Sequence, residues 1–208
     1  GYPPYIIAEA GVAHFGDMRK AQQLIDLAVA AKADAVKFQM YDVDDLISSE
    51  SQDWKDRLGS RQLPRDSFRH LQQFCQQKGI TFLCTGHDEI SIEFLDKELD
   101  IPAFKVGSGE VGNLASLHGI AQRGKPVIVS TGMYSQQDIA NVIDIFTEAN
   151  NPHLIVLHCV TSYPTPPVDV NLLAMGAIYK KHEVITGFSD HTEGFHIPLA
   201  SVALGACM

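Results

Sequence analysis

The sequence lacks several features that would each point to a particular class of protein. No apolar run approaches the length of a membrane-spanning helix, so we expect no membrane partner. The N-terminal stretch has neither the charged region nor the long apolar region of a signal peptide. The four cysteines form no C-x-x-C pair, and Cys84 and Cys159 lie in apolar runs, which favours buried free thiols. Together these absences predict a cytoplasmic protein.

Positive charge is also scarce. The 208 residues include 16 lysines and arginines against 25 aspartates and glutamates, which gives a net charge of -9. Because proteins that bind nucleic acid usually present a basic face, we expect no nucleic-acid partner. An anionic small substrate is compatible with this balance, since one pocket can be locally basic. The length, with 45% hydrophobic and 20% charged residues, predicts a single globular domain over residues 1–208.

Short apolar runs recur along the chain, and segments with helical spacing separate most of them. The runs begin at Tyr5, Ala35, Ile80, Ala103, Val127, Leu154 and Val184. Apolar stripes predict helices over residues 18–33, 66–79 and 135–150, with Gly79 as a C-cap and Ser135 as an N-cap. The charged stretch over residues 42–66 is the one long connection, and it is expected to be either a lid or a surface loop with a short helix.

Buried strands that alternate with amphipathic helices indicate a parallel α/β fold with both faces of the sheet covered. Polar residues follow nearly every strand, as in an α/β barrel, whereas a doubly wound sheet would concentrate them near one switch point. We therefore predict a (β/α)8 TIM barrel. Seven strands can be counted, so the barrel is expected to stop before its eighth strand. The strand-end residues are Glu9, Lys37, Gln39, Thr85, Lys105, Ser108, Glu110, Ser130, Thr131, His158, Tyr163 and Ser189 to His191.

Serine, aspartate and histidine stand side by side in "GFSDHTEG". Neighbours on a strand point to opposite faces, so Ser189, Asp190 and His191 are not expected to converge as a hydrolytic triad. The sequence also has no G-x-S-x-G elbow. At a strand end, His191 is better interpreted as a metal ligand or proton carrier, with Asp190 near enough to assist. The alternative is a surface histidine beside a helix N-cap formed by Asp190 or Thr192.

Two lysines lie inside apolar strands. An unpaired ammonium is costly there, so Lys105 and Lys37 each need an anion. The glycines that flank Ser108 let the backbone approach a ligand closely. With Ser130 and Ser189 nearby, the lysines predict a pocket for phosphate and carboxylate groups. The alternative pairs the lysines with Glu9 and Glu110 in structural ion pairs, which rarely stabilise a fold by themselves.

Other polar residues keep two interpretations each. Glu9 can act as an acid or base, or it can neutralise the nearby lysine. His14 follows in a loop, where helix capping or solvent exposure is expected. Tyr163 precedes a rigid proline turn and either offers its hydroxyl to a sugar-like substrate or packs against the proline. His87 and Asp88 either reach the mouth of the barrel or form a turn.

Six motifs in series resemble the sialic acid synthase family: "IAEAGVAHFGD", "ADAVKFQ", "IPAFKVGSGE", "GKPVIVSTGM", "LHCVTSYPTPPVDVNL" and "GFSDHTEG". The resemblance runs from about Ile6 to Ala206. It implies the condensation of phosphoenolpyruvate with an N-acylmannosamine-type sugar aldehyde, which yields a nonulosonic acid and phosphate. It also implies a divalent metal, Mn²⁺ or Mg²⁺, that orients the aldehyde.

The resemblance assigns a role to each site residue. It implies that Glu9 and Glu110 serve proton transfer or water positioning, and that Lys37 meets the carboxylate of phosphoenolpyruvate. Tyr163 would contact the amino sugar, and His191 matches one of the family's two metal-binding histidines. The residues expected around the phosphate are Thr85, Lys105, Ser108, Ser130 and Ser189.

The family has further parts that these residues do not include. Its second metal histidine lies on an eighth strand, and a C-terminal antifreeze-like domain reaches across a homodimer to the partner's sugar site. We therefore expect a homodimer for the full-length protein and an incomplete site in the 208 residues alone. His87, Asp88 and Thr161 depart from the usual motifs at the sugar end, which leaves the acceptor open. The competing functions are a synthase that uses an aldose phosphate and a non-catalytic barrel that binds a ligand or partner.

Overall fold

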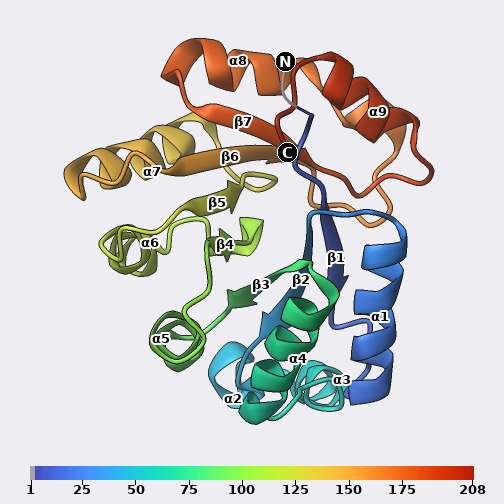
Figure 1. Ribbon diagram of the computed structural model, residues 1–208. Helices are drawn as coiled ribbons and strands as arrows, with labels where there is room; N and C mark the ends of the chain where they lie inside the picture. Colours follow the sequence, from blue (N-terminus) through green and yellow to red (C-terminus); the bar gives the residue numbers. More distant parts are fainter. Residues whose placement is uncertain (1–2) are drawn as a thin grey trace. The chain divides into compact units, whose positions relative to one another are not determined.

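The computed structural model describes residues 3–208 (Figure 1). The chain divides into two compact units, and each has its own parallel sheet. The N-terminal unit comprises Ile6–Pro102. The C-terminal unit comprises Ala103–Met208 together with the N-terminal segment that ends at Tyr5.

The N-terminal unit contains a three-stranded parallel sheet in the order β1-β2-β3. Its strands are β1 (Ile7–Gly11), β2 (Ala35–Met40) and β3 (Thr81–Gly86). The register places Glu9 opposite Lys37, and Gln39 opposite Thr85. Apolar side chains on alternate positions, such as Phe38, are fully buried, because a parallel sheet is covered on both faces. The register therefore places polar residues of neighbouring strands beside one another.

Five helices belong to this unit: α1 (Met18–Ala30), α2 (Val43–Leu46), α3 (Gln52–Gly59), α4 (Arg65–Lys78) and α5 (Glu89–Lys97). The α1 and α4 helices pack beside each other, and α4 and α5 pack on β3 (Figure 1). The predicted C-cap is confirmed, since Gly79 takes a left-handed conformation with φ of 72°. The long charged connection contains the two short helices α2 and α3, so it holds more helix than the sequence predicted.

The C-terminal unit contains a four-stranded parallel sheet in the order β4-β5-β6-β7. The strands are β4 (Phe104–Val106), β5 (Val127–Ser130), β6 (Leu154–Cys159) and β7 (Ile185–Ser189). Its helices are α6 (Leu114–Ala121), α7 (Gln136–Glu148), α8 (Leu173–His182) and α9 (His196–Ala203), with short 3-10 turns η1 (Ser108–Glu110) and η2 (Pro167–Asp169). The predicted N-cap Ser135 forms a full capping box with Asp138 at the start of α7. Helix α8 packs on β6 and β7 (Figure 1).

The seven predicted strands are confirmed within residues 3–208, and a short backbone ladder follows α9. The amide of Cys207 donates to the Thr186 carbonyl at 3.1 Å, and the amide of Phe188 donates to the Met208 carbonyl at 2.9 Å. On the other side, the amide of Tyr5 donates to the Cys207 carbonyl at 2.8 Å. The backbone after α9 therefore runs between β7 and the segment that contains Tyr5, in the same unit.

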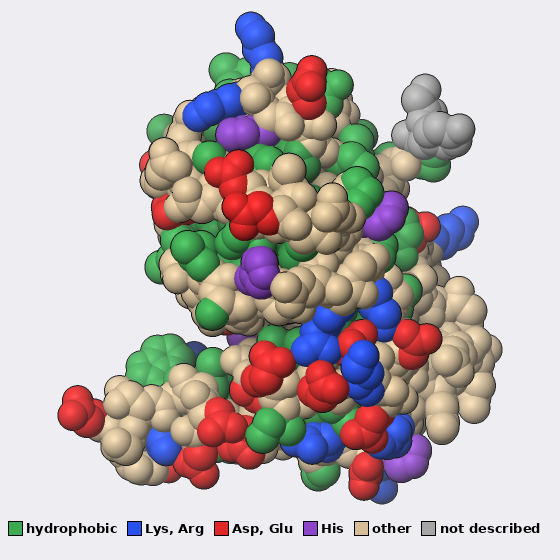
Figure 2. Space-filling model, turned by 90° about the vertical axis from the view of Figure 1, so that its left-hand side faces the viewer, with side chains coloured by type: hydrophobic (Ala, Val, Ile, Leu, Met, Phe, Trp, Pro, Cys, Tyr) green, Lys and Arg blue, Asp and Glu red, His purple; other side chains and the backbone are tan. Residues whose placement is uncertain are grey.

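The surface carries both signs of charge. Figure 2 shows lysine and arginine side chains interspersed with aspartate and glutamate side chains on one face. Among the ion pairs of the N-terminal unit, one joins Arg69 to Glu98 and another joins Lys78 to Asp26. The prediction of free thiols is confirmed, and three of the four cysteines are buried, with Cys207 exposed. Among the described residues, no helix combines the length and apolar character that crossing a membrane requires.

Candidate functional site

Polar side chains of the N-terminal unit gather at the end of its sheet. Lys37 Nζ on β2 lies 2.5 Å from Oε2 of Glu9, its register partner on β1. The same ammonium donates to the Thr85 hydroxyl on β3 at 3.5 Å. The side-chain amide of Gln39 donates to Oε1 of Glu9 at 3.3 Å. We call these four residues the Lys37 cluster. The parallel register brings them together, because Glu9 lies opposite Lys37 and Gln39 lies opposite Thr85.

The charge of the Lys37 cluster is balanced inside the unit. Lys37 is 7% exposed, whereas the side chain of Glu9 is 49% exposed. A buried ammonium is costly without a counter-charge, and the half-exposed carboxylate supplies one. For Lys37, the structure therefore shows the ion pair with Glu9 that the sequence left as an alternative. Burial raises the pKa of the neighbouring Cys84 thiol. The positive charge of Lys37 lowers this pKa and the negative charge of Glu9 raises it, but burial is the largest effect, so the thiol stays protonated at neutral pH.

A second group lies at the end of the sheet in the C-terminal unit. Lys105 on β4 donates to the Ser130 hydroxyl at the end of β5, at 2.6 Å. The Ser108 hydroxyl in η1 accepts from the backbone N–H of Gly132 at 2.9 Å. Oγ of Ser108 also lies 3.2 Å from Sγ of Cys159, the last residue of β6. We call these five residues the Lys105 cluster.

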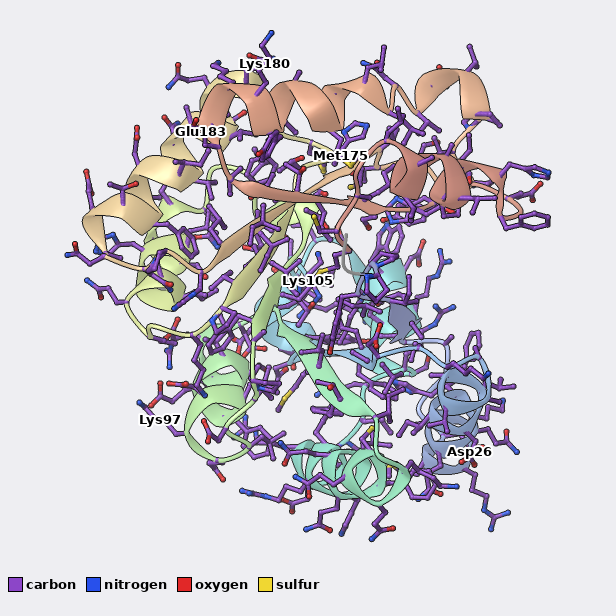
Figure 3. All side chains as sticks on the ribbon, turned by 45° about the horizontal axis from the view of Figure 1, so that its top comes forward. Asp26, Lys97, Lys105, Met175, Lys180 and Glu183 are labelled. Carbon is purple, nitrogen blue, oxygen red and sulfur yellow. The ribbon has the colours of Figure 1, made fainter. Side chains whose placement is uncertain are left out.

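Lys105 differs in placement from the lysines on the helices of the same unit. It projects from β4, whereas Lys180 lies on the outer side of α8 (Figure 3). Lys105 is half-buried and Lys180 is exposed. The Lys105 ammonium also donates to the Val106 carbonyl at 2.9 Å, while Ser130 is only 4% exposed. Hydrogen bonds to fixed acceptors hold the ammonium in one orientation at the strand ends.

Glu110 lies two residues beyond Ser108, in the same 3-10 turn. Its Oε2 accepts from the side-chain amide of Asn113 at 2.8 Å. Burial, with the charges of Glu110 and Asp138, raises the pKa of Tyr134 to about 12. The Tyr134 hydroxyl therefore remains protonated at neutral pH, and among the described residues it has no hydrogen-bond partner.

His191 lies in the loop after β7, with one ring nitrogen already engaged. Its Nδ1 lies 2.7 Å from the Val160 carbonyl. A carbonyl only accepts, so Nδ1 carries the proton and the lone pair of the neutral ring is on Nε2. The Tyr163 ring packs on the imidazole, with 4.1 Å between ring centroids, and Tyr163 is 72% exposed. The arrangement leaves Nε2 suited to binding a metal ion.

The remaining neighbours of His191 test whether "SDH" caps a helix or forms a hydrolytic triad. Oδ1 of Asp190 accepts from the amide of Thr192 at 3.0 Å and from its hydroxyl at 2.8 Å. Helix α9 begins only at His196 and follows Phe195, so the alternative interpretation, an N-cap by Asp190 or Thr192, does not hold. Because Nδ1 of His191 faces a backbone carbonyl, the stretch does not form a hydrolytic triad.

The side chains of residues 3–208 supply only part of the expected divalent metal site. In residues 3–208, no group of three or more histidine, cysteine, aspartate or glutamate side chains is placed to hold a metal ion. His191 offers one ligand atom in the right tautomer, which fits part of a site. A complete site for Mn²⁺ or Mg²⁺ requires further ligands from side chains, substrate or water.

Other candidates fall in different places. Ser189 ends β7, is half-buried and lies in register with Cys159. Asp88 accepts from the Ser91 amide at 2.7 Å as the N-cap of α5 and from the Asp42 amide at 3.0 Å, which supports the turn interpretation. The His87 ring packs edge-on against Tyr41.

His14 is the clearest error of prediction. It is fully buried, whereas the sequence suggested capping or solvent exposure. Its Nδ1 accepts from the Gly16 amide at 3.1 Å, and its ring lies 6.1 Å from that of Phe38. Its Nε2 finds no hydrogen-bond partner among the described residues. The loop after β1 folds back to cover Phe38, which local sequence does not reveal.

Two members of the Lys105 cluster were not singled out from the sequence as site residues. Cys159 was interpreted only as a buried thiol, and Gly132 stands in the quoted motif "GKPVIVSTGM" without a role. A signal for Gly132 was available, since a glycine beside the end of an apolar run can mark a close approach of another part of the chain. In the structure, a Cβ at Gly132 would lie 2.5 Å from the Thr161 hydroxyl and 2.7 Å from Sγ of Cys159.

Comparisons with known proteins give a consistent result. The profile of the NeuB family matches residues 24–208. The chain is 38% identical to an N,N'-diacetyllegionaminic acid synthase of Campylobacter jejuni, over 98% of this chain and 65% of that protein. It is 34% identical to the human N-acetylneuraminate-9-phosphate synthase, over 99% of this chain and 60% of that protein. The chain thus spans less than two thirds of the length of these relatives.

A solved structure confirms the predicted fold class. The crystal structure of an N-acetylneuraminic acid synthetase from Leptospira borgpetersenii, in complex with citrate, superposes with a TM-score of 0.94. That protein is 36% identical, and the match covers 99% of this chain and 71% of that one. The match supports the α/β barrel class that alternating strands and helices predicted.

Proposed function

The chain belongs to the NeuB family, and from this premise we propose that its protein condenses phosphoenolpyruvate with an N-acylmannosamine-type sugar aldehyde to give a nonulosonic acid and phosphate. The observation that carries the proposal is the Lys105 cluster, in which the Lys105 ammonium donates to Ser130 and the Ser108 hydroxyl accepts from the backbone N–H of Gly132. Its relatives are synthases of legionaminic acid and N-acetylneuraminate 9-phosphate, which supports this class of reaction.

We assign the phosphate group to the Lys105 cluster. A phosphate dianion is bound best by a cation together with hydroxyl and amide donors. Lys105 would supply the charge, and Ser108 and Ser130 would supply hydroxyls. Ser189, in register with Cys159 on the neighbouring strand, would add a third hydroxyl. Binding at this point places the leaving group where donors can take up its growing negative charge.

We assign the carboxylate of phosphoenolpyruvate to Lys37. Thr85 was expected at the phosphate, but its hydroxyl accepts from Lys37, so we place it with this cluster. A carboxylate would compete with Glu9 for the ammonium, and Glu9 can turn toward solvent because its side chain is half exposed. Glu9 would then be available to position water or transfer a proton.

The chemistry requires one carbon–carbon bond and one molecule of water. Carbon 3 of phosphoenolpyruvate bonds to the aldehyde carbon, and the aldehyde oxygen takes up a proton to become a hydroxyl. Water adds at carbon 2 and gives up its protons, and phosphate leaves from that carbon as the keto group forms. Glu9 and Glu110 are the carboxylates proposed to position the water and to accept its proton. Glu110 is oriented by the amide of Asn113, which holds one of its oxygens in place. Tyr163, exposed beside His191, would contact the sugar.

A divalent metal, Mn²⁺ or Mg²⁺, would polarise the aldehyde carbonyl when bound. We propose Nε2 of His191 as one of its ligands, because the Val160 carbonyl fixes the tautomer. Replacing His191 with alanine in the full-length protein should weaken Mn²⁺ binding, as measured by electron paramagnetic resonance without substrate. Unchanged Mn²⁺ affinity in this variant would remove His191 from the metal site.

The reaction is tested with the full-length protein. It is incubated with Mn²⁺, phosphoenolpyruvate and a panel of mannosamine-type sugars, and phosphate release and product mass are measured. We expect release with at least one sugar and a product that retains all carbons of both substrates. Release only with aldose phosphates would identify the related synthase class instead. Binding of phosphoenolpyruvate by calorimetry without turnover would indicate a non-catalytic relative.

We further propose a cytoplasmic homodimer. The free thiols support a reducing compartment, since cysteines of secreted proteins are usually paired in disulfides. Light scattering on the full-length protein measures the assembly, and a monomeric mass would contradict the proposed dimer.

A further inference from the structure

We propose that the Cys159 thiol and the Gly132 backbone N–H direct the Ser108 hydroxyl proton toward the bound anion. Cys159 is then a positioning residue that acts through Ser108. The inference rests on the proposed function, in which Ser108 contacts the phosphate of phosphoenolpyruvate. It adds a residue that neither the motifs nor the comparisons assign.

The argument begins with the hydrogen-bonding capacity of one hydroxyl. A serine hydroxyl has one proton to donate and two lone pairs that can accept. The Gly132 N–H, at 2.9 Å from Oγ of Ser108, occupies one lone pair. Cys159 Sγ, at 3.2 Å, is close enough to be the second partner. The direction of the proton in this second contact decides what Ser108 can offer to a ligand.

A thiol can take either role in that contact, because it is both a weak donor and a weak acceptor. When Ser108 donates to sulfur, its only proton is used within the protein. When Cys159 donates to Ser108, both lone pairs are filled and the hydroxyl proton must point to another acceptor. A bound phosphate oxygen is a far stronger acceptor than sulfur, so anion binding favours the second arrangement.

The packing around Gly132 holds this arrangement in place. A side chain at Gly132 would collide with Sγ of Cys159 and with the Thr161 hydroxyl, at 2.7 Å and 2.5 Å from the added Cβ. The loop therefore lies directly against the end of β6, and its N–H stays at Ser108. Cys159 is only 3% exposed, so the contact is shielded from competing water.

The other buried thiols provide a contrast inside the same protein. Cys75 lies in the core face of α4, and burial raises its pKa to about 12. Cys84 points its sulfur at the Thr85 carbonyl, at 3.7 Å. Cys159 is set apart because its contact is to the hydroxyl of a proposed substrate-binding residue.

The test uses three single variants of the full-length protein: Cys159→Ala, Cys159→Ser and, as a matched control, Cys75→Ala. The Kd of phosphoenolpyruvate is measured by calorimetry, and KM is measured for both substrates. Cys159→Ala should raise the Kd and KM for phosphoenolpyruvate about tenfold and leave the KM for the sugar unchanged. Cys159→Ser retains a group that donates and accepts, so it should recover most of the loss. Cys75→Ala should bind as the wild type does.

A double-variant cycle separates positioning from packing. In a Ser108→Ala background, Cys159→Ala should cause no further loss, because its effect passes through the hydroxyl. An equal loss in that background, or a Cys159→Ser variant as weak as Cys159→Ala, would overturn the inference. Wild-type affinity in Cys159→Ala would do the same. If Cys159→Ala does not fold in a melting assay, Cys159→Val, which also lacks a hydrogen-bonding group, is compared in the two Ser108 backgrounds, with an effect expected only where Ser108 is present.

These outcomes separate the inference from the function on which it rests. A wild-type protein that binds no phosphoenolpyruvate would overturn both. Wild-type binding with no dependence on Cys159 would overturn the positioning role alone.

Discussion

The two strand lysines are held in different ways, although each lies inside an apolar parallel strand. The ammonium of Lys37 lies 2.5 Å from a carboxylate and is 7% exposed at the residue level. Lys105 donates to a hydroxyl and a carbonyl, beside a second hydroxyl that is held by an amide and a thiol. In the Lys37 cluster a carboxylate balances a buried ammonium, and in the Lys105 cluster a hydroxyl and a carbonyl oxygen accept hydrogen bonds from the ammonium.

The register of each sheet explains the difference. Glu9 lies directly opposite Lys37 on β1, so an ion pair forms across neighbouring strands. Opposite Lys105 on β5 is the apolar Ile128, and the hydroxyl that the lysine reaches is that of Ser130, two positions further along the same face. Lys37 and Lys105 both lie in apolar parallel strands, but their register partners differ, and so do their hydrogen-bond and ion-pair partners.

The largest expected effect comes from removing the ammonium of the Lys105 cluster. Lys105→Ala should weaken phosphoenolpyruvate binding about 100-fold, because a charged hydrogen-bond donor to phosphate is lost. The melting temperature should change little. Lys180→Ala on the exposed side of α8 is the control and should bind normally. If Lys105→Ala melts far below the wild type, the lysine is structural and the two clusters are alike.

Most of the fold could be predicted from the sequence, because hydrophobic periodicity is a local signal. All seven apolar runs became strands, and Gly79 and Ser135 cap helices as their residue types indicated. The connection over residues 42–66 was less certain, since its charged residues carry no clear apolar stripe. There, α3 begins at Gln52 and ends at Gly59.

The site was less predictable, because side-chain partners depend on tertiary contacts. The pairing of Lys37 with Glu9 was foreseen as an alternative, since both stand near strand ends. The burial of His14 was not, because only the folded loop covers Phe38. The contact between Cys159 and Ser108 joins positions 51 residues apart, and no local pattern reports it.

The second prediction tests how tightly the Lys105 cluster is packed. Gly132→Ala should destabilise the protein by about 1–3 kcal/mol, since its Cβ would meet the Thr161 hydroxyl at 2.5 Å. Chemical denaturation measures the free energy of unfolding. Gly176→Ala in α8 is the control, because the space beside it is open, and it should stabilise the protein by about 0.5–1 kcal/mol. Equal effects of the two substitutions would contradict the close approach at Gly132.

The third prediction measures the ion pair of the Lys37 cluster. A double-mutant cycle with Lys37→Met and Glu9→Gln should give a coupling free energy of about 1 kcal/mol or less, because Glu9 is half exposed to solvent. The coupling should also decrease in high salt. A coupling of several kcal/mol that salt does not reduce would mean that Glu9 is held as rigidly as Lys37. In that case Glu9 could not release the ammonium to a substrate.

The smallest effect concerns His14, which covers the strand that carries Lys37. Burial lowers the pKa of His14 below its ordinary value, and the Gly16 amide occupies Nδ1. Above the ordinary pKa, both the folded and unfolded chains hold a neutral ring. Between the ordinary pKa of histidine and the lowered pKa of His14 in the folded chain, the unfolded chain binds a proton at this residue and the folded chain does not. The contribution of His14 to stability is therefore present at higher pH and lost on acidification through this window.

Urea unfolding at pH 7.5 and at about pH 5 tests this sign against the ordinary histidine pKa of about 6.5. The wild type should lose more stability over this interval than His14→Gln, because the variant has no ring to protonate. His70→Gln, at an exposed position of α4, is the control and should keep the wild-type slope. If His14→Gln loses more stability on acidification than the wild type, the folded wild-type chain binds a proton at His14 more tightly than the unfolded chain does. The ring would then have an acidic partner, and the N-terminal unit would hold a second balanced charge beside Lys37.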